Sequence, residues 1–345
     1  MIVLFFFCQC GEELTSGTSS ETKNTLSLAK INMNTTDRGE NFWGMAFNYP
    51  LLVRLDTNYD FSRCGGSGKN IEFFKNDTVT PLPFEIELWD SAASRAAIWV
   101  KLDTLKGQDS VQHIFMRCYD SEFSTSLYTK ENVFSPTNGF SYVLHMDQDT
   151  VLNQPEIIRQ GNMGELVSSL VGEGVAFDGE DDFLSVPDIF LQKNDPVTVS
   201  GWFQVSDVEG SYTLASLYNP ELSTSLLTIM VNGNVLEIIF LGNTTLASFT
   251  GISPNTWHYL SFVLTGNGNI SLYIDGDLVI TTAIVQQVPG FGYILLGHSN
   301  NGKDLMKGIV DELRVSSVSR SAEWIKLNYR NQMKDSHLVT LYAGE

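Results

Sequence analysis

Two stretches decide the fold of the second half of the chain: Gly-Val-Ala-Phe-Asp-Gly-Glu-Asp-Asp-Phe-Leu at 174–184 and Gly-Ile-Val-Asp-Glu-Leu-Arg-Val at 308–315. Between them lie short runs of alternating apolar and polar residues, separated by turn residues at regular spacing. This spacing is typical of an antiparallel β-sandwich. The strongest hairpin signal is Asp275-Gly276, within the alternating run 269–280. We therefore predict that residues 138–345 form a sandwich domain.

Short motifs follow one another in a fixed order through this half. They are Phe177-Asp178-Gly179, Val199-Ser200-Gly201-Trp202, Trp257-His258, Leu272-Tyr273-Ile274-Asp275-Gly276, Leu296-Gly297 and Ile309-Val310-Asp311-Glu312-Leu313-Arg314. No single motif is specific, but together they resemble the LamG-like jelly rolls of the concanavalin A-like lectin and glucanase superfamily. The resemblance implies that the first strand, at 140–147, lies beside the last. It also implies surface binding more often than it identifies a ligand, so function must be argued from a site.

The first half is also rich in strand patterns, at 42–58, 71–74, 84–89, 97–102 and 112–119. Alternation at 84–88 places Glu85 and Glu87 on one face, which we interpret as the solvent side. The segments 49–55, 69–74, 81–90 and 97–102 resemble the bacterial domain of unknown function 2341, which often precedes a LamG-like jelly roll in surface proteins. That family has no agreed activity.

The chain is thus predicted to be all-β, with two β-sandwich domains, the second a concanavalin A-like (LamG-like) jelly roll. A length of 345 residues is sufficient for two cores. Residues 29–125 form the predicted first domain. Residues 11–28 are polar and small and predict a flexible tether.

The apolar run within residues 1–10 resembles a signal or lipoprotein segment. Cys8 or Cys10 would carry the lipid, although Phe7 and Gln9 stand where such signals have small residues. We therefore expect an exported protein, at the cell surface, attached to the outer membrane or extracellular. Membrane contact is expected only through this anchor.

The charge of the chain argues against nucleic acid as a partner, and two of its cysteines could form a disulfide. Forty acidic and 21 basic residues give a formal net charge of −19, which repels the phosphates of nucleic acids. Cys64 and Cys118 either form a disulfide in an oxidising compartment or remain two unpaired cysteines packed as small hydrophobes.

An acidic turn places Asp178, Glu180, Asp181 and Asp182 within five residues. Carboxylate oxygens are the ligands that calcium prefers. The two-residue period puts Asp311 on the predicted core face, with Ile309, Leu313 and Val315. The predicted ligands of a structural calcium ion are therefore Asp178, Asp181, Asp182 and Asp311. The alternative is that Asp311 is a structural carboxylate that accepts backbone N–H bonds from a neighbouring loop.

Ligand-binding aromatics are expected at the loop rim, whereas Trp202 and Trp257 read as core residues. The candidates are Tyr218, Phe291 and Tyr293, with polar contacts from Asn300, Asn301 and Asp304. The sequence lacks the Glu-x-Asp-x-x-Glu run of laminarinase-like enzymes, and we found no other catalytic motif. We expect non-catalytic binding of a polysaccharide or surface glycan. The alternatives are a structural or adhesive module that recognises another surface protein and a divergent polysaccharide hydrolase or lyase.

Overall fold

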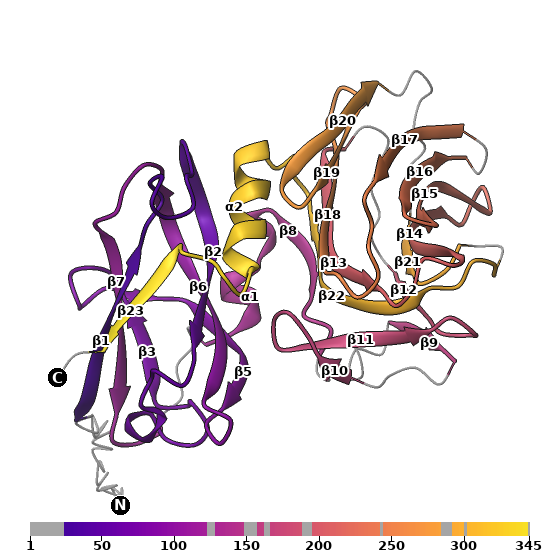
Figure 1. Ribbon diagram of the computed structural model, residues 1–345. Coiled ribbons are helices and arrows are strands. Elements are labelled where there is room, and N and C mark those ends of the chain that lie inside the picture. The colour runs from indigo at the N-terminus through magenta and orange to yellow at the C-terminus, as the bar shows by residue number, and fades with distance from the viewer. Residues whose placement is uncertain are drawn as a thin grey trace, which may run out of the picture.

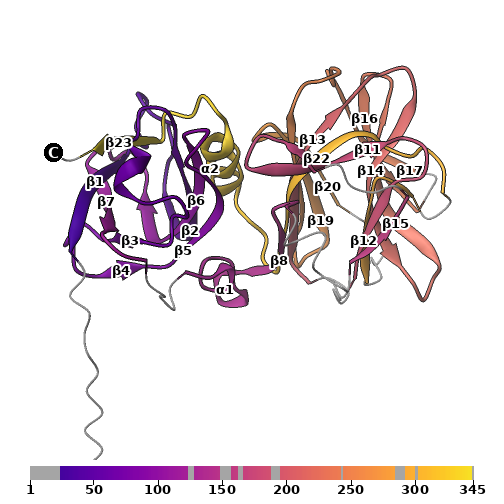
Figure 2. The same cartoon turned by 90° about the horizontal axis from the view of Figure 1, so that it is seen from below.

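The structure is a computed structural model that describes residues 24–122, 128–147, 157–161, 166–187, 195–241, 244–283, 292–299 and 302–343. These residues form two β-rich domains placed side by side, with a helix between them (Figures 1 and 2). Among the helices of this part of the chain, none combines the length and apolarity needed to cross a bilayer.

The first domain consists of two antiparallel sheets. One has the strand order β23-β1-β7-β3-β4 and the other the order β2-β6-β5. The expected strands at 71–74 and 112–119 have the predicted bounds. The strands are β1 (Thr25–Met33), β2 (Met45–Leu55), β3 (Ile71–Phe74), β4 (Pro81–Leu82), β5 (Phe84–Asp90), β6 (Arg95–Lys106), β7 (Gln112–Tyr119) and β23 (Val339–Ala343), with a short 3-10 helix η1 (Phe61–Arg63).

Both ends of this domain differ from the prediction. Strand β1 begins inside the segment predicted as a tether, because the alternating Ala29, Ile31 and Met33 bury one face of it. Strand β23 pairs antiparallel with β1, from Met33 opposite Val339 to Ala29 opposite Ala343. Figure 1 shows this yellow strand beside the indigo β1. We predicted that the jelly roll extends to residue 345. It ends earlier, because the chain returns to the first domain and adds β23 to its sheet.

The second domain is a sandwich of two antiparallel sheets. One has the order β10-β11-β22-β13-β18-β19-β20, with β8 also paired to β22, and the other has the order β17-β16-β15-β14-β21-β12-β9. The strands are β8 (Phe140–Leu144), β9 (Ile158–Gln160), β10 (Leu166–Ser168), β11 (Glu173–Asp178), β12 (Phe183–Val186), β13 (Val197–Val205), β14 (Ser211–Asn219), β15 (Thr224–Asn232), β16 (Val235–Phe240), β17 (Thr244–Thr250), β18 (His258–Leu264), β19 (Asn269–Ile274), β20 (Asp277–Ala283), β21 (Tyr293–Leu296) and β22 (Lys307–Ser316).

Two predictions about this sandwich are confirmed. The first strand, β8, pairs with the last, β22. The β19–β20 hairpin turns at Asp275 and Gly276, whose φ angles of 53° and 79° suit a tight hairpin turn. One apolar core lies between the sheets, with Phe262 and Leu272 from one and Leu236 and Ile294 from the other.

A helical connection and one long helix lie between the domains. The connection is α1 (Lys130–Val133) and the 3-10 helix η2 (Pro136–Asn138), and the longer helix is α2 (Ala322–Gln332). Ser321 caps α2 by accepting the backbone N–H of Trp324, and Trp324, Ile325 and Leu327 are buried.

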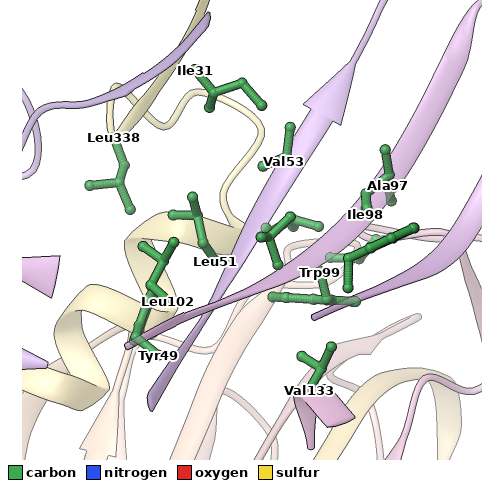
Figure 3. Close-up of a cluster of buried hydrophobic side chains, with 14 of the residues drawn as sticks. Ile31, Tyr49, Leu51, Val53, Ala97, Ile98, Trp99, Leu102, Val133 and Leu338 are labelled. Atoms are coloured by element: carbon green, nitrogen blue, oxygen red, sulfur yellow. The ribbon is translucent and has the colours of Figure 1, made fainter. Parts of the chain in front are cut away.

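A second apolar cluster joins the domains through α2. It contains Tyr49 and Leu51 of β2, Trp324 of α2, and Trp202 and Tyr259 from the outer face of the larger sheet. Figure 3 shows its first-domain part, together with Val133 and with Leu338 from the C-terminal segment. The outer face of that sheet is therefore packed against α2 and the first domain.

Candidate functional site

Two of the predicted ligand-binding residues lie next to each other on the smaller sheet. In the β14–β21 ladder Leu217 pairs with Ile294 and Tyr218 pairs with Tyr293. Leu217 and Ile294 belong to the sandwich core, so the two-residue period points both tyrosines to the outer face. Their ring centroids are 6.3 Å apart, and both side chains are half-buried. The tyrosines lie in strands rather than in the loops we expected.

Of the predicted polar contacts, Asp304 does not join this pair. Asp304 is exposed, and its carbonyl accepts the backbone N–H of Thr213, five residues along β14 from Tyr218. Phe291, Asn300 and Asn301 lie outside the described residues, as do the predicted lipidation residues Cys8 and Cys10.

The way the domains pack covers the outer face of the larger sheet and leaves that of the smaller sheet, which carries the tyrosine pair, away from the interface. On the larger sheet, Trp202 Nε1 donates to Gln332 of α2 at 2.7 Å, and Tyr259 accepts from Asn328 of α2. Trp202 thus packs against α2 rather than inside the sandwich core. Of the two sheets, the smaller one turns its outer face away from the first domain (Figures 1 and 2).

The acidic turn forms a compact group of oxygens. One carboxylate oxygen each from Asp178, Asp181 and Asp182 lie within 4.8 Å of one another. Asp182 is 5% exposed, its Oδ2 accepts the N–H of Asp178, and its buried Oδ1 has no partner among the described residues. Burial, together with the neighbouring charges of Asp178 and Asp181, raises the pKa of Asp182. Gly161 covers the group, because a Cβ there would lie 2.4 Å from Asp182 Oδ1.

Asp311 does not belong to this group. In the β11–β22 ladder Asp178 pairs with Lys307, four residues before Asp311, which corresponds to about 13 Å along a strand. Asp311 Oδ2 instead accepts the hydroxyl of Ser169 at 2.7 Å and the backbone N–H of Val171 at 3.1 Å. This is the alternative weighed above, a carboxylate bonded to a neighbouring loop. The predicted four-ligand calcium site is wrong in this respect.

A β-bulge in β22 explains why Asp311 faces the first domain. The register against β13 shifts between Ser200 and Trp202, and Glu312 has a φ of 54°. Val310, Leu313 and Val315 therefore face the sandwich core, while Asp311 and Glu312 are fully buried on the other side. Strict alternation wrongly grouped Asp311 with Leu313.

The buried charges meet at the domain interface. His145 Nδ1 lies 2.5 Å from Glu312 Oε1 and 3.5 Å from Glu87 Oε2, and His145 Nε2 lies 3.4 Å from Glu85 Oε2. Arg314 donates to the other Glu312 oxygen and to Asn328. We name Glu85, Glu87, His145, Glu312 and Arg314 the interface cluster.

Sequence reasoning missed this cluster. The side chains of Glu85 and Glu87 are only 14% and 1% exposed, so the prediction that they face solvent is wrong. The two side chains do share a face, but that face is covered by His145 and Glu312 of the second domain. The signal in the sequence is a histidine among the apolar residues of 142–146.

The cluster perturbs the acidity of its members. Burial lowers the pKa of His145, but the charges of Glu312, Glu85 and Glu87 together raise it well above its ordinary value. Burial acts to raise the pKa of Glu312, yet His145 and Arg314 lower it to about 2. Burial raises the pKa of Glu87 well above its usual range.

The cysteines of the first domain lie together. Cys64 and Cys118 form a disulfide with Cα atoms 5.1 Å apart, which is an ordinary separation for such a bond. The bond joins the loop after η1 to β7.

Comparisons with known proteins agree with this two-domain architecture. Residues 178–326 match the sequence profile of the concanavalin A-like lectin/glucanases superfamily, and residues 67–148 match that of a domain of unknown function, DUF2341. No curated protein matches the sequence.

Solved structures with a similar fold include receptor-binding domains of neurotoxins. The botulinum neurotoxin serotype D ligand binding domain, solved in complex with N-acetylneuraminic acid, is 15% identical, with a TM-score of 0.45 over 56% of this chain and 51% of that chain. The botulinum neurotoxin type G receptor binding domain is 12% identical, with a TM-score of 0.38 over 52% and 45% of the two chains. The chain thus spans about half the length of these domains, and nothing about its own ligand follows from the likeness. The sequence profiles and the sandwich together identify a DUF2341 domain followed by a domain of the concanavalin A-like lectin/glucanase superfamily.

Proposed function

We propose that the protein binds a polysaccharide or surface glycan, without catalysis, on the outer face of the smaller sheet. The observation that carries this proposal is the pair Tyr218 and Tyr293, adjacent on the sheet face that points away from the first domain. Aromatic rings offer a flat apolar surface to the C–H face of a sugar and a hydroxyl to its polar edge.

Depletion by insoluble polysaccharides tests this proposal. The purified protein is mixed with a panel of cell-wall and storage polymers, and the unbound fraction is measured. We expect selective depletion by one polymer, and an affinity about tenfold weaker for Tyr218→Ala and for Tyr293→Ala, corresponding to about 1.4 kcal/mol for one lost stacking contact.

The control is Tyr342→Ala, which removes an exposed tyrosine from β23 of the first domain. Equal binding by the control and the two sheet variants would contradict the site. If no polymer depletes the protein, the glycan proposal fails, and recognition of another surface protein becomes the better explanation.

We also propose that the acidic turn binds a structural calcium ion through Asp178, Asp181 and Asp182. The unpartnered, buried Asp182 Oδ1 supports this, because a buried carboxylate oxygen needs a cation or a donor. Calcium is expected to raise the melting temperature and a chelator to lower it, and Asp182→Asn is expected to remove the difference. Identical melts of the natural protein with calcium and with chelator would contradict the ion.

Export to the cell surface remains our proposal for localisation. The Cys64–Cys118 disulfide supports it, since such bonds persist mainly in oxidising compartments. Cell fractionation with an antibody against the protein tests it, and recovery in the cytosol with free thiols would contradict it.

A further inference from the structure

Three side chains from separate parts of the chain converge in the interface cluster. Glu87 comes from β5 of the first domain, His145 follows β8, and Glu312 lies at the bulge of β22. One ligand atom from each lies within 4.8 Å of the other two. Their side chains are 1%, 1% and 0% exposed, so water does not compete for these atoms.

Neighbouring residues hold each of these side chains in place. Arg314 binds Glu312 Oε2, which leaves Oε1 facing His145. Trp99 Nε1 donates to Glu87 Oε2 at 2.6 Å, while Glu87 Oε1 is buried without a partner among the described residues.

Another carboxylate lies at the opposite nitrogen of the imidazole. Glu85 Oε2 lies 3.4 Å from His145 Nε2. A carboxylate opposite the ligating nitrogen is the usual arrangement of metal-binding histidines. Here the two atoms lie at ion-pair distance rather than in a hydrogen bond.

Charged groups of both signs surround this centre. The carboxylates near it are Glu85, Glu87, Asp311 and Glu312, and the cations that interact with them are Arg54, Lys130 and Arg314. A metal ion at His145 Nδ1 and a proton on His145 are the two alternatives, because each would place a positive charge beside Glu312.

We propose that Glu87, His145 and Glu312 bind one divalent transition-metal ion, with Zn²⁺ as the best match, which joins the first domain to the jelly roll. One imidazole nitrogen and carboxylate oxygens form a donor set that suits zinc, whereas calcium takes oxygen ligands. In a zinc site with bonds of about 2.0–2.2 Å, ligand atoms lie about 3.3–3.5 Å apart, so the His145–Glu312 contact must open by less than about 1 Å. The proposal is independent of glycan binding.

Metal content is the first test. The full protein, purified without a histidine tag, is loaded with Zn²⁺, dialysed, and analysed for bound metal. We expect about one zinc ion per chain in the natural protein. Glu87→Gln keeps the side-chain shape and an oxygen for Trp99, and is expected to weaken zinc binding by about a hundredfold. Glu85→Gln, which alters only the orienting carboxylate, is expected to weaken it by about tenfold.

Cobalt provides a readout that does not depend on the variants. Co²⁺ in the natural protein is expected to give visible absorption bands that Zn²⁺ displaces. Glu209→Gln, at an exposed position away from both acidic groups, serves as the control and is expected to bind both metals as the natural protein does. Absence of bound zinc and of cobalt bands in the natural protein would overturn the proposal and leave a protonated His145 as the occupant. Equal zinc binding by the natural protein and Glu87→Gln would overturn the assigned ligands.

Discussion

At the scale of single residues, the most unusual feature is a fully buried arginine between the domains. The Arg314 guanidinium lies 4.2 Å from the ring centroid of Trp99 and 5.0 Å from that of Phe134, besides its bonds to Glu312. Aromatic faces attract a desolvated cation, so two rings and one carboxylate replace the water that Arg314 loses.

We expect Arg314→Met to destabilise the protein by about 3–5 kcal/mol, because it leaves Glu312 buried without one of its two positive partners. Urea unfolding followed by tryptophan fluorescence measures the change. Arg38→Met, at an exposed position, is the matched control and should change stability by less than about 0.5 kcal/mol. If Arg314→Met lowers the free energy of unfolding as little as the control does, the Arg314–Glu312 ion pair contributes little to stability.

The residues show where sequence reasoning ends. The burial of Asp311 was predictable from its apolar neighbours, but its direction was not, because one extra residue at Glu312 reverses the alternation after it. Glu87 was misjudged for another reason: a strand shows which side chains share a face, and not what covers that face. Tyr218 and Tyr293 were chosen separately, and only the sheet order makes them neighbours.

At the scale of elements, the C-terminal segment completes the first domain. Leu338 is fully buried, and its carbonyl accepts the backbone N–H of Asn34 just before β23 pairs with β1. Residues 339–343, Val-Thr-Leu-Tyr-Ala, are a run too short to predict this partner from sequence. The strands that could be predicted, such as β3 and β7, show alternating apolar and polar residues or a run of apolar residues within their own sequence.

Leu338→Ala is expected to cost about 2–4 kcal/mol through the lost contacts and the cavity left behind. Thermal unfolding of this variant is compared with Leu278→Ala, which changes the same residue type at an exposed position of β20. Similar melting temperatures for the two variants would show that the segment contributes little to the first domain.

The disulfide makes a separate prediction for the first domain. The bonded residues are 54 positions apart, so replacing both Cys64 and Cys118 by Ala is expected to cost about 4 kcal/mol by the loop-entropy estimate. Chemical denaturation of the double variant measures the loss. The reference is the natural protein in a reducing agent, which should lose a similar amount of its free energy of unfolding. Unchanged stability in both samples would show that the disulfide does not stabilise the domain.

At the scale of the whole molecule, the two domains share one apolar cluster. Trp202 and Tyr259 of the sandwich belong to the same cluster as Tyr49 of the first domain. Sequence patterns predicted two domains but not the packing between them, because the sequence of α2 does not reveal that both of its sides are covered.

We therefore expect a single unfolding transition in calorimetry, with a van't Hoff enthalpy equal to the calorimetric enthalpy. Asn331→Ala removes the side chain that forms hydrogen bonds with both the N–H and the carbonyl of Leu52. We expect this variant to unfold at a lower temperature, with a transition that begins to separate into one step for each domain. Two well-separated transitions in the natural protein would contradict the shared core.

The pairing of β23 with β1 also sets an order of events during synthesis. The first domain is made first, yet its sheet cannot close until residues 339–343 have left the ribosome. The strands of the sandwich are all available before that moment, since the last of them ends at Ser316. The later half of the chain can therefore fold ahead of the earlier half, which waits for its final strand with an open sheet edge.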